Sequence, residues 1–310
     1  MSVRMTVAVT DREWFDTLRS ESEARKLEEV NFWSPSPQNF RALESGEFLL
    51  FKLRRGDHPD GRDDIVGGGI FFRALICPCS HAWETFGVAN GAKSALQMRT
   101  RIAQYRQDQH DHSDFDVGCR ILTQPFFLDE KDWIPVPWHR NIVRFKTFNT
   151  SDGEGHQLWD NVQDRLARQP LELGEQRERY ATPQLIKPRI GQGGFRELIT
   201  DIYGRRCAVT RERTLPALEA AHIRPYSSGG EHRADNGLLL RRDIHTLFDH
   251  GYVTVTPEMR FEVSGRIREK FENGRDYYAL HGKRVVVPRP TAERPDVQTL
   301  EWHNDRVFLG

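Results

Sequence analysis

The sequence predicts an α+β protein made of two domains. Three observations lead to this prediction: the length, the low apolar content, and a change in the pattern of segments near residue 190. The chain has 310 residues, whereas a single domain typically holds ~100–200. Only 37% of the residues are hydrophobic and the mean hydropathy is −0.66. These values fit two small cores better than one large core.

The charge balance neither suggests nor excludes a nucleic-acid partner. The chain carries 45 Lys+Arg and 45 Asp+Glu residues, so its formal net charge is zero. Local basic patches steer binding even when the whole protein is neutral. Four cysteines in a chain of this length do not make a disulfide framework. The sequence lacks an apolar run of ~18 residues and a signal-peptide pattern over 1–10, so we expect a cytoplasmic protein.

Residues 1–170 are expected to form the first domain, with a curved antiparallel sheet and helices. Spaced apolar residues in a charged stretch predict a surface helix, and apolar runs bounded by polar turns predict strands. The glycines Gly67, Gly68 and Gly69 predict a bulge or a close backbone approach. We expect helices over 11–27 and 92–105, strands over 47–53, 65–74 and 117–123, and an acidic loop over 108–116.

Residues 171–190 are charged, end in prolines and predict a linker, and residues 191–310 are expected to form the second domain. Its pattern is that of short strands, a polar loop and a helix. We expect helices over 195–203 and 242–248, strands over 206–210, 218–223, 253–255 and 260–263, and a loop over 224–236.

Three polar residues of the second domain stand at strand, loop and helix positions. His222 ends a strand, Asn236 ends the Gly-containing loop, and His245 lies on the following helix. The flanking text is RRCAVT, followed by LEAAHIRPYSSGGEHRADNGLLLRRDIHTLFDHGY. This segment resembles the HNH endonuclease family, which has a ββα-metal fold. The resemblance implies that His222 is the general base, that His245 is a metal ligand, and that Asn236 orients the base or completes the metal site.

The sequence departs from the family at the residue before the first histidine. Many HNH nucleases have an Asp ligand there, whereas this chain has Ala221. Glu219 is a candidate replacement, although strand alternation places it on the face opposite His222. Asp243 lies about 200° from His245 around the helix and is a weaker candidate. A site with few protein ligands fits Mg²⁺, which retains water, with Mn²⁺ or Zn²⁺ as alternatives.

Other candidate residues have plainer interpretations. Cys77, Cys79 and His81 resemble part of a zinc site but lack a fourth ligand, so packed thiols are favoured. Cys207 lacks a second Cys pair, so we expect no structural zinc in the nuclease domain. Arg206 and Arg224 are candidates for contacts with DNA phosphates, with a solvated charged face as the alternative.

The first domain resembles the PUA-like superfamily, which includes the EVE, ASCH and SRA-type modules. The resemblance rests on the segment NFWSP, the run EFLLFKL, a polar turn, the run IVGGGIFF and a later Trp–Pro loop. It implies a small curved β-barrel that binds modified bases. Loop aromatics are suited to stacking a flipped base, although anchoring of the loops is the alternative. The candidate pocket residues are Phe32, Trp33, Ser34 and Trp133.

Together, the two resemblances are to the modification-dependent (type IV-like) restriction endonucleases of bacteria. They imply an antiphage enzyme that cuts double-stranded DNA containing modified cytosine. Because one HNH site cuts one strand, a homodimer is expected. Two alternatives stay open. The first domain could sense phosphorothioate DNA, a nucleotide signal or a protein, or the chain could be a non-catalytic DNA-binding module because Asp is missing at 221.

Overall fold

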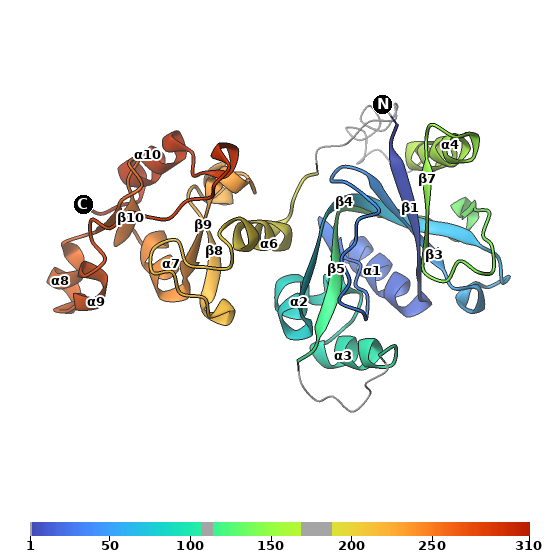
Figure 1. Ribbon diagram of the computed structural model, residues 1–310, viewed down its shortest axis with the longest axis horizontal. Coiled ribbons are helices and arrows are strands. Elements are labelled where there is room, and N and C mark those ends of the chain that lie inside the picture. The colour runs from blue at the N-terminus through green and yellow to red at the C-terminus, as the bar shows by residue number, and fades with distance from the viewer. Residues whose placement is uncertain (1, 107–113, 169–187) are drawn as a thin grey trace. The chain divides into compact units, whose positions relative to one another are not determined.

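The computed structural model describes residues 2–106, 114–168 and 188–310 (Figure 1). The chain divides into two compact units, Met1–Ile190 and Gly191–Gly310. The predicted linker falls mostly outside the described residues, as does most of the predicted acidic loop. None of the described helices has the length and apolar character needed to cross a membrane.

The first unit is built around one mixed sheet. Its strands follow the order β2-β5-β4-β3-β1-β7, and β6 also pairs with β4. All pairings are antiparallel except β1 with β3. The strands are β1 (Arg4–Thr10), β2 (Glu29–Asn31), β3 (Phe48–Leu53), β4 (Asp64–Pro78), β5 (Asp116–Phe127), β6 (Ile134–Pro135) and β7 (Phe145–Asn149).

The sheet is open, which corrects the expectation of a closed PUA-like barrel. Closure would require β2 to pair with β7, and no such pairing exists among the described residues. Bending is instead local, at register shifts in β4 between Gly68 and Ile70 and between Phe71 and Arg73. The predicted close approach is confirmed, because a Cβ on Gly68 would lie 2.9 Å from the Leu49 carbonyl oxygen.

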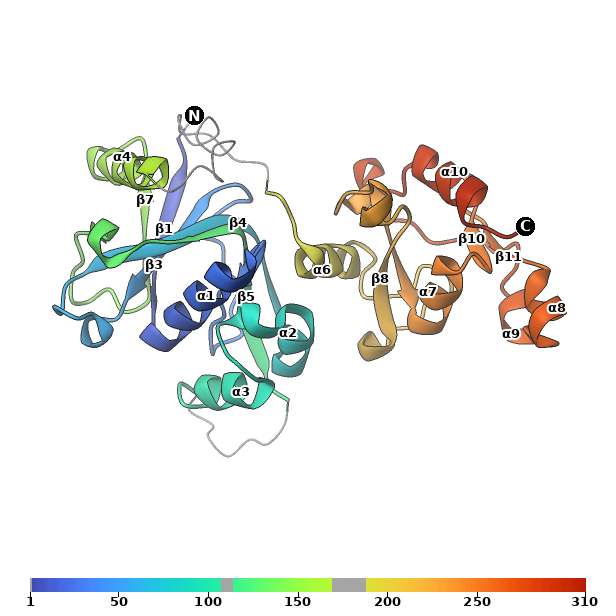
Figure 2. The ribbon, with the colours of Figure 1, turned by 180° about the vertical axis from the view of Figure 1, so that it is seen from behind.

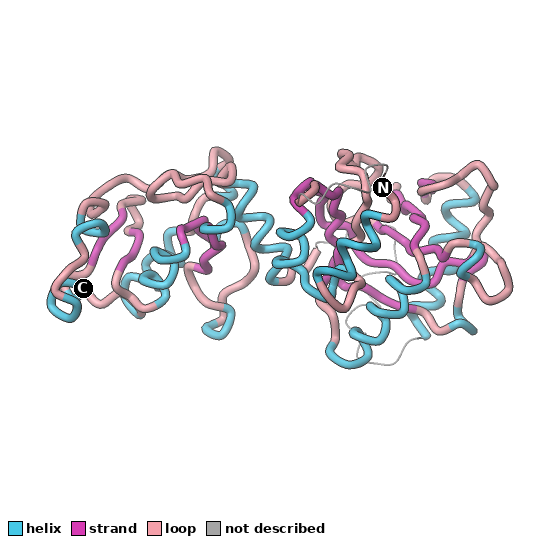
Figure 3. Tube along the Cα trace, turned by 90° about the horizontal axis from the view of Figure 1, so that it is seen from below, coloured by secondary structure: helices cyan, strands magenta, loops and turns pink. Residues whose placement is uncertain are grey.

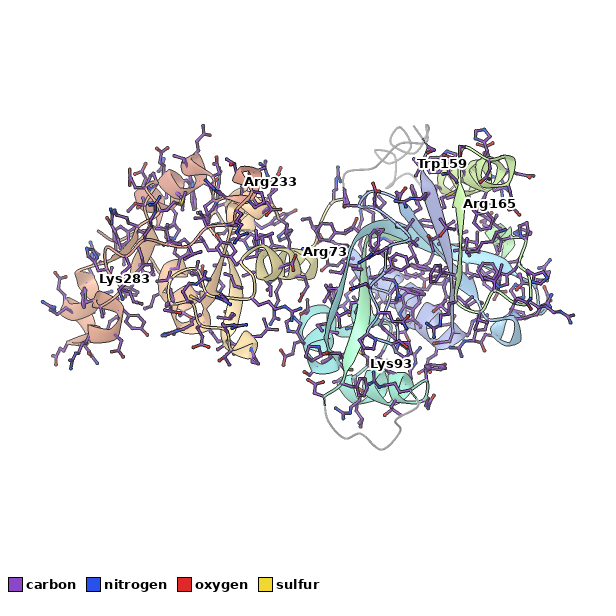
Figure 4. The ribbon with its side chains drawn as sticks, viewed as in Figure 1. Arg73, Lys93, Trp159, Arg165, Arg233 and Lys283 are labelled. Atoms are coloured by element: carbon purple, nitrogen blue, oxygen red, sulfur yellow. The ribbon has the colours of Figure 1, made fainter. Side chains whose placement is uncertain are left out.

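Within the described part of the first unit, four α-helices accompany this sheet. Helix α1 lies against one face, behind the sheet in Figure 1 and in front of it in Figure 2. Asp11 caps α1, since its carboxylate accepts a hydrogen bond from the Trp14 N–H. Trp159 of α4 is buried and meets Phe48 of β3 edge to face at 5.3 Å (Figure 4). The helices are α1 (Arg12–Arg25), α2 (Cys79–Phe86), α3 (Ala95–Ala103) and α4 (Gly153–Arg168).

The cysteines of the first unit are packed thiols. Cys77, Cys79 and Cys119 are buried and are not joined by disulfide bonds, and the sulfur atoms of Cys77 and Cys119 are 3.8 Å apart. Burial raises the pKa of Cys79 to about 11, with a further contribution from Asp114. The Cys79 thiol is therefore protonated at neutral pH. All three cysteines belong to a small core beside α2 and α3.

The second unit has two short hairpin sheets with helices around them (Figure 3). The predicted strand over 206–210 is wrong. This segment forms turns, with Arg205 and Arg211 at positive φ, and the Ala208 N–H donates to the Leu239 carbonyl. The elements are α6 (Gln192–Ile202), β8 (Leu218–His222), β9 (Gly237–Arg241), α7 (Arg242–Asp249), β10 (Val253–Val255), β11 (Phe261–Val263), α8 (Arg266–Phe271), α9 (Arg275–Tyr278) and α10 (Val297–Arg306).

A histidine on α10 is buried in the core of the second unit. His303 is 2% exposed and stacks on Phe248 at 3.7 Å. Its Nδ1 lies 2.8 Å from the Thr254 hydroxyl and its Nε2 lies 3.2 Å from the Phe248 carbonyl oxygen. Burial lowers the pKa of His303 to about 4, against the opposing effect of the hydrogen bond to that carbonyl. The folded protein therefore holds this ring neutral.

We predict that His303 makes folding sensitive to acid. In the unfolded chain the ring takes up a proton below about pH 6.5, whereas in the fold it does so only near pH 4. The stability is complete above pH 6.5 and is lost as the pH falls toward 4, by about 2 kcal/mol between pH 7 and pH 5. Urea unfolding at both pH values measures this loss. The variant His303→Gln keeps a donor for the carbonyl but does not titrate. Its unfolding free energy is therefore expected to fall by about 2 kcal/mol less than that of the wild type between pH 7 and pH 5. An equal loss in the two proteins would contradict the assignment.

Candidate active site

The candidate site is built on β8, β9 and α7 of the second unit (Figure 1). Strands β8 and β9 pair antiparallel, with Glu219 opposite Leu240 and His222 opposite Gly237. Helix α7 buries Ile244 and Phe248, which are four residues apart and share one face. The same spacing places His245 and Asp249 together on a neighbouring face. The predicted strand–loop–helix arrangement is confirmed.

His222 is held by aromatic stacking and by a second histidine. Its ring stacks on Phe195 of α6 with centroids 3.9 Å apart and an interplanar angle of 11°. Its Nε2 lies 2.9 Å from Nδ1 of His232, and His232 in turn stacks on Tyr226 at 5.2 Å. Burial and, to a smaller extent, the charges of His232 and His245 together lower the pKa of His222 to about 4. His222 is therefore neutral at pH 7 and able to accept a proton.

The contact with His232 restricts which nitrogen of His222 can act as a base. A neutral imidazole has one protonated and one free nitrogen. If Nε2 of His222 donates to Nδ1 of His232, then Nδ1 of His222 is the free nitrogen. A hydrogen bond on one ring nitrogen sets the state of the other in this way. His232 was not singled out from the sequence, although it is the second of the four histidines within the motif segment.

We predict that His232 sets the activity of His222 through this hydrogen bond. The variant His232→Ala loses the acceptor and should slow DNA cleavage about 10- to 100-fold, the usual cost of removing a partner that orients a functional histidine. The variant His232→Asn offers an amide oxygen near the position of Nδ1 and should restore most of the rate. Single-turnover cleavage of a plasmid measures both variants. Equal rates for the two would show that the acceptor does not matter.

Asn236 organises the loop rather than contacting either histidine. Its amide oxygen accepts from the Arg224 N–H at 2.9 Å, and its amide nitrogen donates to the carbonyl oxygens of Arg224 and Glu231 at 3.0 and 2.9 Å. A Cβ on Gly230 would lie 2.9 Å from that amide nitrogen. The side chain is 6% exposed. Its polar side-chain atoms bond to the main chain of the loop that carries His232. A role for Asn236 in the metal site or in orienting the base stays a prediction.

His245 meets carboxylates on both of its ring nitrogens. Its Nδ1 lies 2.9 Å from Glu219 Oε2, and its Nε2 lies 3.3 Å from Asp249 Oδ2. Arg242 donates from Nε to the other oxygen of Glu219 at 2.7 Å. Burial raises the pKa of Glu219, but its hydrogen bonds with His245 and Arg242 outweigh burial and keep the pKa below the usual value. The weakly favoured candidate Glu219 is thus one of the two carboxylates that contact His245, and the nearer one.

Asp249 and Asp243 behave differently. Burial raises the pKa of Asp249, and the charge of His245 only partly offsets this effect. In Glu219, by contrast, the hydrogen bonds outweigh burial. Asp243 pairs with Arg241 and accepts a hydrogen bond from the Tyr277 hydroxyl at 3.3 Å, which places it away from His245. The sequence analysis did not identify Asp249 as a candidate. Its spacing of four residues from His245 could have done so, because residues four apart share one face of a helix.

The two arginines proposed for phosphate contacts come before and after β8 in the chain. Arg224 donates from Nε to the Ser228 carbonyl oxygen at 2.7 Å and lies 5.3 Å over the Trp302 ring. Its guanidinium thus helps to shape the loop between β8 and β9. Arg206 is half-buried in the turn before β8. Contact with DNA stays a prediction for both.

A second candidate site is a cavity in the first unit, with a volume of about 520 Å³. It contains three of the four predicted pocket residues, Phe32, Trp33 and Ser34. Trp133 does not line this cavity. Its ring is 7% exposed and its Nε1 donates to the Leu128 carbonyl oxygen at 3.1 Å, which makes it a core residue. The remaining lining comes from the end of β1, the start of α1, the segment before β3, Arg54 after β3, Tyr105 after α3, Arg120 of β5, and residues 143–145 at the start of β7.

Comparisons with known proteins agree with the motif. Residues 207–256 match the sequence family described as HNH endonuclease. No curated protein matches the chain. Among solved structures, the chain is similar to one titled "Modification dependent TagI restriction endonuclease", with 13% sequence identity, a TM-score of 0.30, and coverage of 90% of this chain and 75% of that chain. The C-terminal unit therefore carries an HNH endonuclease domain, and the activity of that domain's family is that of a nuclease.

Proposed function

We propose that this protein is a metal-dependent DNA endonuclease that cuts DNA carrying modified cytosine. The observation that carries the nuclease part is His222, a neutral imidazole with Nε2 engaged by His232. The separate group of His245 and Glu219 lies on the adjoining helix and strand. We propose that the first unit reads the modification through its aromatic cavity.

The hydrolysis needs a base for the attacking water and a positive charge near the phosphate. We propose that Nδ1 of His222 takes the proton of the water, for which a pKa below neutrality keeps the ring ready. Phe195 and His232 fix the ring on its face and at its edge, so the base does not have to be ordered during the reaction.

HNH endonucleases generally use a divalent metal. Glu219, His245 and Asp249 supply the oxygen and nitrogen donors that such ions bind. Within the described residues, no group of three or more His, Cys, Asp or Glu side chains is arranged to hold a metal ion. Glu219 and Asp249 face different nitrogens of the His245 ring, and we propose that the ion is shared with only one of these carboxylates.

The donor chemistry therefore fits a cation held by two protein ligands. Glu219 and His245 would hold it, with water and the substrate phosphate completing its shell. When bound, the ion would stabilise the charge on the phosphate and on the leaving oxygen. A site that leaves room for water favours Mg²⁺, with Mn²⁺ or Zn²⁺ as alternatives.

The cavity of the first unit supports the proposed reading function. Trp33, Phe40, Tyr105 and Phe145 contribute aromatic rings to its lining, and such rings stack bases. Its volume lies within the range of about 300–1,000 Å³ that is usual for small-ligand sites. The cavity is thus large enough to hold a base that has left the duplex.

The experiment uses plasmids with unmodified, 5-methyl or 5-hydroxymethyl cytosine, incubated with the full chain and Mg²⁺ or Mn²⁺. Cutting of the modified plasmids alone is the expected result. Equal cutting of all plasmids would overturn the reading function but not the nuclease. No cutting of any plasmid with either metal would overturn the nuclease. The ratio of nicked to linear product reports whether one or two sites act, which tests the proposed homodimer.

A further inference from the structure

The cavity of the first unit has an excess of positive charge in its lining, in addition to its aromatic rings. Four arginines contribute to the wall, and the single carboxylate there is already used. Asp11 caps α1 through the Trp14 N–H and pairs with Arg101. Among the residues that the structure describes, none of the four lining guanidiniums has an ion pair. These arginines are Arg41, Arg54, Arg120 and Arg144.

Arg120 is the least solvated of the four. Its main chain is fixed on β5, since Phe32 N–H donates to its carbonyl and its own N–H donates to the Phe32 carbonyl. Its guanidinium lies 4.7 Å over the Phe40 ring. Burial lowers its pKa to about 10, with Cys119 opposing this and Arg144 lowering it further. The group is still charged at pH 7, and a desolvated charge without a counter-ion is costly.

The aromatic rings at the mouth of the cavity complement these charges. Tyr105 is 45% exposed with Arg54 lying 4.7 Å over its ring, and Phe145 is 44% exposed and meets Phe40 edge to face. Exposed rings beside unpaired guanidiniums fit a ligand with a planar aromatic part and an anionic part. An apolar ligand would leave the charge of Arg120 uncompensated.

We propose that this cavity binds a whole nucleotide, with its base against the aromatic rings and its phosphate against Arg120 and Arg144. This deepens the reading function proposed above and partly rests on it. The shared chemistry has two sources, a free nucleotide or a nucleotide flipped out of DNA. A guanidinium binds a phosphate through paired charge-assisted hydrogen bonds, which adds geometric selectivity to the attraction.

The experiment measures binding to the full chain without metal, so that it does not depend on cleavage. The ligands are deoxycytidine, its 5′-monophosphate, and the 5-methyl form of each. We expect the monophosphates to bind at least about 10-fold more tightly than the nucleosides. Arg120→Gln should remove this preference, and Arg144→Gln, at the exposed rim, should reduce it. Arg25→Gln, whose side chain pairs with Glu21 on α1, is the matched control and should retain it.

A second arm identifies the source. A duplex with one 5-methylcytosine beside a 2-aminopurine gains fluorescence when the cytosine leaves the stack. A gain that is lost in Arg120→Gln supports a flipped nucleotide, and binding of free nucleotides without such a gain supports a free one. Equal binding of nucleosides and monophosphates would overturn the inference, as would an unchanged preference in correctly folded Arg120→Gln and Arg144→Gln. Neither result would contradict the proposed nuclease activity, which the plasmid assay tests separately.

Discussion

Replacing His222 with Ala is expected to lower the cleavage rate by about 10²–10⁴-fold, the usual contribution of a positioned general base. The expectation rests on the neutral state of the ring and on the nitrogen left free by His232. DNA affinity should change little, because phosphate contacts by arginines supply most of the nonspecific binding. Single-turnover cleavage and a binding assay without metal measure the two quantities.

The control for this variant is His250→Ala. His250 is exposed just after α7 and its Nδ1 approaches the Thr246 carbonyl oxygen at 2.7 Å. It belongs to the same unit but to neither histidine group, so its loss should leave cleavage nearly unchanged. If His222→Ala instead abolished DNA binding or unfolded the second unit, the ring on Phe195 would be structural and the role of base would be withdrawn.

Replacing Glu219 with Gln is expected to raise the metal concentration for half-maximal cleavage by about 10- to 100-fold. The change keeps the shape of the side chain and removes the charge that faces His245. A titration of Mg²⁺ and Mn²⁺ against the cleavage rate measures this shift, and saturating metal should recover part of the activity.

Asp243→Asn is the matched control for Glu219→Gln. Both changes remove one carboxylate charge from the second unit, but Asp243 is paired with Arg241 and bonded to Tyr277. Its loss should affect stability slightly and leave the metal requirement unchanged. A shift in Asp243→Asn that equals the shift in Glu219→Gln would mean that net charge, rather than a ligand, explains the effect.

The sequence allowed much of the fold to be predicted where the signal is local. The strands over 47–53 and 65–74 and the helix over 11–27 follow from periodicity and turns, and the structure has them as β3, β4 and α1. Strand β1 was missed. Five of its seven residues are buried, and Arg4 and Val9 are half-buried, because β3 and β7 flank it. Those neighbouring strands lie far away in the sequence.

The sequence by itself determined the chemistry of the second unit. His222, Asn236 and His245 stand out through their spacing and flanking residues, which local strand, loop and helix signals place on β8, before β9 and on α7. The tertiary structure decided which side chains meet. In the fold, His222 contacts His232, His245 contacts Glu219, and the Asn236 side chain bonds to the main chain of the loop. These contacts depend on how the loop folds back and how the helix crosses the hairpin, which are set by burial of the whole core and not by any local pattern.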